Sequence, residues 1–352
     1  MELKFLGLGS AFQTKLYNTS AFFVEEDVLF LIDFGETAFE QLKAQSFLND
    51  IKEIYVVFTH THSDHIGGIA KLANYCYEIL KKPLNIVIPS KDRLYEDILS
   101  LFNIFSVPKD SYTFILPYDL TNVFNEFDGI TFLPTKHSNE LKDTCYSLMF
   151  STNKGNVFYS GDSIDTKYIE MLICDDYTKM NNFDKMYIDV TLSIPDAHLD
   201  LNVLEKIVPK NLRHKVFCMH FDSLDSLYTA QRIGFSIPEY FAVDLCMKSH
   251  DYNWKKENKN LILSGCYELC FFQLQHRNFF SDIDTITIEV ENTNPENVGC
   301  LGSLLTYSYY VLKRPIIVIC KNPDKAVNEN IKENMKKLAK IFGTPEESLF
   351  FK

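Results

Sequence analysis

The stretch His60-Thr61-His62-Ser63-Asp64-His65 places four potential metal ligands within six residues. It follows an apolar, β-branched run over residues 54–58 and precedes Gly67-Gly68 and a helix-like run over residues 69–80. These patterns predict a buried strand that opens into a loop and then a helix, where a rigid scaffold often presents catalytic groups. Imidazole and carboxylate ligands without cysteine favour Zn²⁺, Mn²⁺ or Fe at a catalytic site that keeps a water. The stretch therefore predicts a metal centre.

The H-x-H-x-D-H pattern resembles that of the metallo-β-lactamase superfamily, and further motifs follow in that family's order. The segments at residues 3–12, 18–20 and 31–35 are similar to the N-terminal strands of the branch that includes ribonuclease Z and related phosphodiesterases, in which Asp33 would support the first ligand loop. The later ligand motifs are 134–138, 159–163 and 216–220, each at the end of an apolar run. The resemblance covers residues 1–235 and implies an αββα sandwich with its catalytic loops along one edge.

That resemblance also implies a binuclear metal site. The ligands would form two groups that share one residue: His60, His62 and His137 for one divalent metal, Asp64, His65 and His220 for the second, and Asp162 as the bridge. Two cations about 3.5–4 Å apart can activate a shared water and neutralise the charge that grows on a phosphoryl or acyl group. We therefore expect hydrolysis by attack of a metal-bridged hydroxide, which Asp64 could also orient. Zn²⁺, Mn²⁺ and Fe all suit these ligands.

A possible acid catalyst lies between the fourth and fifth motifs. Asp189-Val190-Thr191 and His198 occupy places comparable to a Glu-Ala-Thr segment and a later histidine in the ribonuclease-Z-like branch. A histidine near the leaving oxygen, held by a carboxylate, is the usual pairing for proton transfer. The alternative is a surface histidine in the turn at residues 195–198. Aspartate in place of glutamate shortens the supporting arm, so the role of Asp189 stays open.

Composition narrows the organisation and the partners. The chain has 352 residues, 46% of them hydrophobic, with 29 Phe and 19 Tyr, which predicts two domains with a core each. We place them at residues 1–245, a hydrolase domain, and 261–352, a small domain that binds nucleotide or dimerises. The net charge of −12 and the pI near 5.3 argue against extended nucleic acid, because polyanion binding needs clustered Lys and Arg. A small anionic nucleotide held by the metals does not need such clustered basic residues.

The cysteines and the hydropathy pattern point to a cytoplasmic protein. Nine cysteines are scattered without a C-x-x-C pair, so a zinc ribbon or redox motif is not indicated and we expect buried free thiols. The N-terminus begins directly with a strand pattern and lacks a leader sequence. Since no run approaches 18 apolar residues, a membrane span is not expected.

The sequence beyond about residue 240 predicts a separate Rossmann-like α/β unit. Residues 249–260 read as a polar connector. After it, the pattern predicts three strands and two helices, namely strands at 261–266, 284–290 and 314–320 and helices at 301–312 and 327–342.

One segment of this unit, residues 297–303, is similar to nucleoside 2-deoxyribosyltransferase-like domains, but Ser303 or a neighbour stands where their nucleophilic Glu would be. This difference favours nucleotide binding or dimerisation over glycosyl transfer. The alternative is an appendage that stabilises or dimerises the hydrolase.

Three functions follow from these observations. The first is a binuclear phosphodiesterase that hydrolyses a small nucleotide, most simply a cyclic one. The resemblance to related phosphodiesterases, which are often dimers, also leads us to expect a homodimer. The second is a transfer-RNA 3′-end endonuclease, which commonly carries a Gly/Pro-rich or basic arm that is missing between Asp162 and His220. The third is a non-catalytic nucleotide sensor that uses the C-terminal domain. Hydrolysis of a β-lactam or thioester also fits the fold, because a fold does not fix its substrate.

Overall fold

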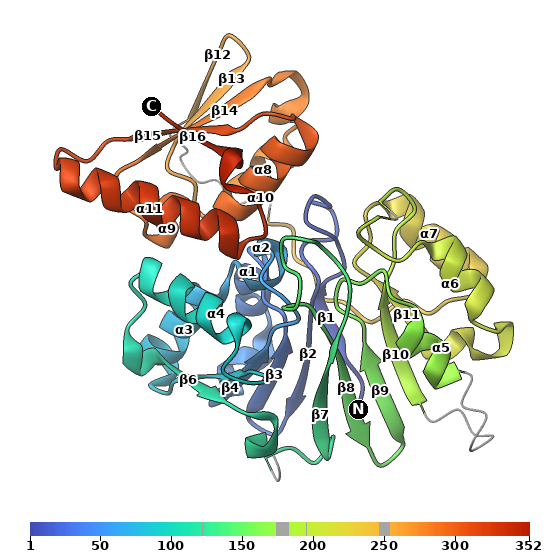
Figure 1. Ribbon diagram of the computed structural model, residues 1–352. Coiled ribbons are helices and arrows are strands. Elements are labelled where there is room, and N and C mark those ends of the chain that lie inside the picture. Colours follow the sequence, from blue (N-terminus) through green and yellow to red (C-terminus); the bar gives the residue numbers. More distant parts are fainter. Residues whose placement is uncertain (121–122, 174–182, 195, 246–253) are drawn as a thin grey trace.

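The computed structural model describes residues 1–120, 123–173, 183–194, 196–245 and 254–352, and the strands of these segments form three sheets (Figure 1). The first sheet has the order β1-β2-β3-β4-β5-β6. Its strands are β1 (Lys4–Gly7), β2 (Ser20–Glu25), β3 (Val28–Ile32), β4 (Glu53–Val57), β5 (Leu84–Val87) and β6 (Tyr112–Ile115). The second sheet has the order β11-β10-β9-β8-β7. Its strands are β7 (Gly129–Pro134), β8 (Tyr146–Thr152), β9 (Gly155–Tyr159), β10 (Phe183–Asp189) and β11 (Val216–Met219).

Alternation of side chains along the strands builds the two layers of core. In β3, Leu29 and Leu31 pack with the helices, whereas Phe30 and Ile32 pack against the second sheet. This is the period of two that a strand covered on both faces requires. The Phe30 ring lies 6.0 Å from that of Phe150 on the opposite sheet. The two sheets therefore share one aromatic core.

Helices cover the outer faces of both sheets (Figure 1). Beside the first sheet lie α1 (Ala38–Lys43), α2 (Ser63–Ile66), α3 (Ile69–Tyr75) and α4 (Arg93–Ile104). Beside the second lie α5 (Lys167–Ile173), α6 (Leu201–Ile207) and α7 (Leu224–Ile233). This layering confirms the predicted αββα sandwich. No helix of the described segments is long and apolar enough to cross a membrane.

The third sheet, which has the order β12-β13-β14-β15-β16, belongs to a small α/β unit at the C-terminal end. Its strands are β12 (Trp254–Glu257), β13 (Asn260–Ser264), β14 (Thr285–Val290), β15 (Ile316–Cys320) and β16 (Leu349–Phe351). Its helices are α8 (Cys270–His276), α9 (Pro295–Val298), α10 (Leu301–Thr306) and α11 (Lys325–Ile341). Strands β13 to β16 are parallel neighbours in chain order, and crossovers of the usual right hand would place the connecting helices on one face. The predicted small α/β fold is confirmed.

Several predicted boundaries were wrong in this unit and beside the ligand loop. The polar connector was expected over residues 249–260, but 254–257 form β12, which pairs antiparallel with β13, and 249–253 lie outside the described residues. The helices expected at 69–80 and 301–312 both change from α to π geometry, at Cys76–Leu80 and Tyr307–Val311. Hydrophobic periodicity does not distinguish such a turn from a continuing α-helix. Short 3₁₀ turns complete the chain at 46–50, 109–111, 117–120, 210–215, 279–282 and 346–348.

The start of α7 gives a first testable prediction. Ser223 accepts a hydrogen bond from the Ser226 backbone N–H at 3.1 Å, and the Ser226 side chain returns the contact in a capping box. Ser223→Ala should lower stability by about 1 kcal/mol and the melting temperature by about 2 °C. Calorimetry is the measurement, and Ser223→Asn, which can still cap, is the control. Equal melting temperatures for the alanine variant and the unaltered protein would contradict the role of the cap.

Candidate metal centre

The loop after β4 is shaped by a buried carboxylate at the end of β3. Asp33 accepts hydrogen bonds from the backbone N–H of Thr59 at 2.7 Å and from its hydroxyl at 2.9 Å. The Asp33 carboxylate also lies 2.9 Å from Nδ1 of His65. Since β3 and β4 are parallel neighbours, their ends meet at one sheet edge. Asp33 therefore supports the ligand loop, as the sequence indicated.

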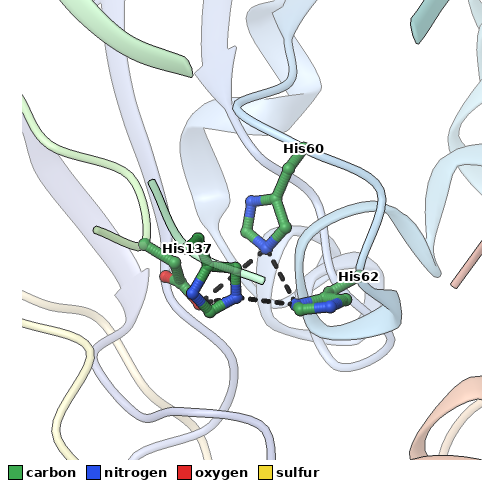
Figure 2. A group of neighbouring side chains, drawn as sticks. His60, His62 and His137 are labelled. Carbon is green, nitrogen blue, oxygen red and sulfur yellow. Dashed lines mark hydrogen bonds and ion pairs between the residues drawn. The ribbon is translucent and has the colours of Figure 1, made fainter. Parts of the chain in front are cut away.

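Three histidines converge on one point beside this loop. Figure 2 shows the rings of His60, His62 and His137 turned toward one another. Nδ1 of His62 lies 3.1 Å from Nε2 of His60 and 3.0 Å from Nε2 of His137. Together with the Asp162 carboxylate, their ligand atoms all lie within 4.8 Å of one another. Such spacing suits three nitrogens and one oxygen around a single divalent cation.

A second group shares Asp162 with the first. Nε2 of His65 lies 3.5 Å from Asp64 and 3.2 Å from Asp162, and Nε2 of His220 lies 3.3 Å and 3.4 Å from the same two carboxylates. Asp162 follows β9 through Gly161, whose φ of +57° favours glycine, and His220 follows β11. The structure thus brings together all seven predicted ligands in two groups joined by Asp162, and Asp162 and His220 also form a third group of this kind with Asp189 and His198.

Asp189 and His198 lie beside the same carboxylate. Nδ1 of His198 is 2.8 Å from Asp189, at the end of β10, and 3.8 Å from Asp162. His198 is 13% exposed and Asp189 is fully buried. The alternative of a surface histidine in a turn therefore does not describe His198, which lies at the edge of the histidine cluster and is paired with a carboxylate.

The buried carboxylates of the site favour positive charge beside them. Burial lowers the pKa of His62 to about 3 and also lowers the pKa values of His60 and His137, so these rings are neutral at pH 7 and keep a lone pair free. Burial also disfavours the charged form of His220, but nearby carboxylates, Asp162 foremost, outweigh it and raise its pKa to about 10. The carboxylates of the site thus stabilise a positive charge on a neighbouring group.

Unsatisfied polar atoms indicate that the residues fit a metal. Among the described residues, no hydrogen bond reaches Nε2 of His65 or Oδ1 of Asp162, although both atoms are buried and lie 3.2 Å from each other. Buried polar atoms normally have partners because desolvation without one costs about 1–3 kcal/mol. A divalent cation bound between them would satisfy both. The donor set, imidazole and carboxylate without thiolate, is that of Zn²⁺, Mn²⁺ or Fe.

One residue that supports the site was missed by sequence reasoning. The Asp222 carboxylate accepts hydrogen bonds from the Thr191 hydroxyl at 2.7 Å and from the backbone N–H groups of Leu192 and Ser193 at 3.2 and 3.0 Å. It therefore ties the loop that precedes His198 to the loop that follows β11. In the sequence, the only signal for Asp222 is its position two residues after the ligand His220. That spacing does not indicate a supporting role unless the fold is known.

Comparison with known proteins gives the same fold and points to one family. The sequence model of a family described as "Anti-Pycsar protein Apyc1" matches residues 1–238. Two proteins of that description, from Bacillus phages 010DV004 and BSP38, are 26% and 28% identical to the chain; each alignment covers 65% of the chain and 92% of the relative. The metallo-β-lactamase fold protein YhfI from Bacillus subtilis superposes with a TM-score of 0.50 at 18% identity, over 68% of this chain and 95% of that one. The predicted metallo-β-lactamase fold is confirmed.

Proposed function

Because the chain belongs to the Anti-Pycsar protein Apyc1 family through residues 1–238, we propose that it is a binuclear phosphodiesterase that hydrolyses a small cyclic nucleotide. That the chain is a metal-dependent hydrolase follows from its fold and its His/Asp cluster. The observation that carries the finer proposal is Asp162, whose carboxylate belongs to both ligand groups. Metal pairs of this kind suit the charge that develops on a transferring phosphoryl group.

The roles proposed for the ligand residues rest on the geometry of the two groups. His60, His62 and His137 would hold one divalent cation, Asp64, His65 and His220 the second, and Asp162 would contact both. When bound, the cations would supply Lewis acidity and lower the pKa of a coordinated water toward neutrality. The Asp64 carboxylate, which adjoins His65 and His220, would also orient the attacking group.

His198 is the proposed general acid. Its Nδ1 is held at 2.8 Å by Asp189, so Nε2 is the ring nitrogen that remains to donate a proton to the leaving oxygen. Asp189 is itself fixed, because its carboxylate also accepts from the Ser163 backbone N–H at 3.2 Å. The shorter aspartate therefore still reaches the histidine, and Asp189 acts as a positioning residue.

The C-terminal unit is proposed to be a second domain, and its boundary is moved to include β12, since β12 pairs with β13. Nucleotide binding by this unit, homodimerisation and a cytoplasmic location stay predictions. A small substrate suits the net charge of −12, which opposes a polyanion such as transfer RNA.

Turnover of a substrate panel tests the proposal. The panel contains cyclic purine and pyrimidine mononucleotides, cyclic dinucleotides, a precursor transfer RNA, a β-lactam and a thioester, each with Mn²⁺ or Zn²⁺ and with chelator-treated protein as the control. We expect metal-dependent ring opening of a cyclic nucleotide. Cleavage of precursor transfer RNA alone would replace the proposal with the endonuclease. Metal binding without turnover of any phosphodiester would refute it.

Metal binding should also raise thermal stability. A ligand that binds only the folded state, at a concentration 100 times its dissociation constant, raises the free energy of unfolding by about 2.7 kcal/mol. In a chain of this size, that corresponds to a rise of about 5 °C in melting temperature. We therefore expect Zn²⁺ or Mn²⁺ to raise the melting temperature of chelator-treated protein by about that amount. Mg²⁺, which prefers oxygen ligands, is the control and should have a much smaller effect. Identical melting curves with and without every tested transition metal would contradict a metal site.

A further inference from the structure

Three consecutive residues of the ligand loop contact the C-terminal unit. The Thr61 hydroxyl donates a hydrogen bond to the carbonyl oxygen of Ile341, at the end of α11, at 2.5 Å. The neighbouring His62 and Ser63 face glycines of the same unit, as described next. In Figure 1 the helices of this unit lie over α2, the helix that carries Asp64 and His65. The unit thus covers the side of the loop that faces away from the sandwich.

Two glycines allow this close approach. A Cβ on Gly302, in α10, would lie 2.3 Å from Cβ of Ser63, and a Cβ on Gly343, where φ is +67°, would lie 2.8 Å from Nε2 of His62. Real Cβ atoms do not come this close to their neighbours, so any larger residue would push α10 or the 343 turn away from the loop. Nδ1 of His62 faces the other ligands, and the C-terminal unit therefore contacts the opposite side of its ring.

A buried hydrogen-bonded pair fixes α10 to the first domain. Glu36 is 1% exposed and accepts from the Ser303 backbone N–H at 3.3 Å and from its hydroxyl at 2.7 Å. Burial raises the pKa of Glu36 to about 8. Because the carboxyl group is buried, the loss of a hydrogen bond from Ser303 would leave polar surface without that partner in the interior, which is costly. Glu36 adjoins Gly35, where a Cβ would lie 2.0 Å from the carbonyl oxygen of Asp64. The residue that binds α10, Glu36, is therefore next in sequence to a glycine that packs against the backbone of Asp64, a proposed ligand.

We propose that the C-terminal unit positions the metal-ligand loop, with Ser303 and Gly302 as positioning residues that hold residues 61–64 in their ligating geometry. The proposal rests on the ligand set of the proposed function. The contacts on the loop side are inside the family match, whereas Gly302, Ser303 and Gly343 lie beyond its end at residue 238. The region outside the match thus supports the metal centre through the ligand loop, although it contributes no ligand of its own.

Zn²⁺ affinity of the full-length protein tests this proposal. Chelator-treated variants are titrated with Zn²⁺ against a chelating indicator at 25 °C, after circular dichroism has established that they are folded. Residues that orient ligands typically change metal affinity by about 10–100-fold when altered. We expect about 10-fold weaker binding for Gly302→Val and a smaller, several-fold loss for Ser303→Ala. A contact that only adds global stability would lower the melting temperature and leave the affinity of the folded protein unchanged.

Gly129→Val is the matched control, because a Cβ at Gly129 would meet no atom within 4 Å. It should bind Zn²⁺ like the unaltered protein. Ser303→Ala, which removes atoms and introduces no clash, decides the matter if Gly302→Val does not fold. Folded Ser303→Ala with unaltered Zn²⁺ affinity would overturn the proposal. Because the readout is metal binding, it stays valid even if no cyclic nucleotide is hydrolysed, an outcome that would refute the proposed function alone.

Discussion

Asp162→Ala is expected to lower kcat/KM for a cyclic nucleotide by on the order of 10³-fold or more. The carboxylate lies 3.2–3.8 Å from ring nitrogens of His60, His65, His137 and His220, and it is the residue common to both ligand groups. Alteration of groups that merely orient ligands costs about 10–100-fold, so loss of a ligand shared by two cations should cost more. Alanine also removes negative charge that balances the cations.

Two measurements separate this effect from unfolding. Metal analysis of the purified variant should show fewer than two bound cations per chain, while circular dichroism should show an unchanged fold. Asp128→Ala is the control, since Asp128 is exposed at the opposite end of the second sheet, before β7, and should keep full activity. An Asp162→Ala variant that binds two metals and turns over normally would show that the chemistry lies elsewhere in the molecule.

The metal centre could be predicted from sequence because its ligands are local motifs at strand ends. His60 to His65 follow β4, Asp162 follows β9 and His220 follows β11. Each strand is an apolar run that periodicity detects, and each motif ends it. A two-sheet sandwich collects such ends along one edge, and the resemblance of the motifs and their order to those of the metallo-β-lactamase superfamily implied that these distant residues would meet there.

The C-terminal unit was predicted only in part, because two of its elements, β12 and α8, lack a periodic signal. Strand β12 reads WKKE and is mostly exposed, so its composition resembles a loop. Helix α8 reads CFFQLQH and is buried nearly throughout, which removes the polar face that marks an amphipathic helix. The contacts of Ser303 with Glu36 span 267 residues. Pairs so far apart carry no sequence pattern, and only the packed structure reveals them.

For Asp189 and His198, the sequence indicated the residues but not their role. Their separation of nine residues has no fixed meaning in a loop, so the sequence left a surface histidine and a general acid both open. The fold fixes the position of the pair. Asp189 is the last residue of β10 and lies at the sheet edge where the ligands meet, and Asp222 accepts hydrogen bonds from the loop at residues 191–193. The role of the pair is a question for kinetics.

His198→Ala should slow hydrolysis of a cyclic nucleotide by about 10²–10⁴-fold, the usual contribution of a general acid. The loss should depend on the leaving group. An alkoxide leaves a cyclic nucleotide and needs a proton, whereas p-nitrophenolate leaves bis(p-nitrophenyl) phosphate as a stable anion. With the second substrate the same variant should therefore lose much less activity. Parallel kcat measurements on both substrates provide the test.

A matched set of variants separates proton donation from structural damage. His276→Ala removes an exposed histidine of α8 and should leave both reactions unchanged. Asp189→Asn should reproduce part of the His198→Ala defect with the same dependence on leaving group, because it weakens the hydrogen bond that orients the ring. Its metal content is measured beside its activity, because Asp189 also lies 3.2 Å from Nδ1 of the proposed ligand His220. Equal losses on both substrates would mean that His198 supports the metal site or binds the phosphoryl group. In that case the leaving oxygen would have to receive its proton from another group, and the part of the mechanism assigned to Asp189 would fail with it.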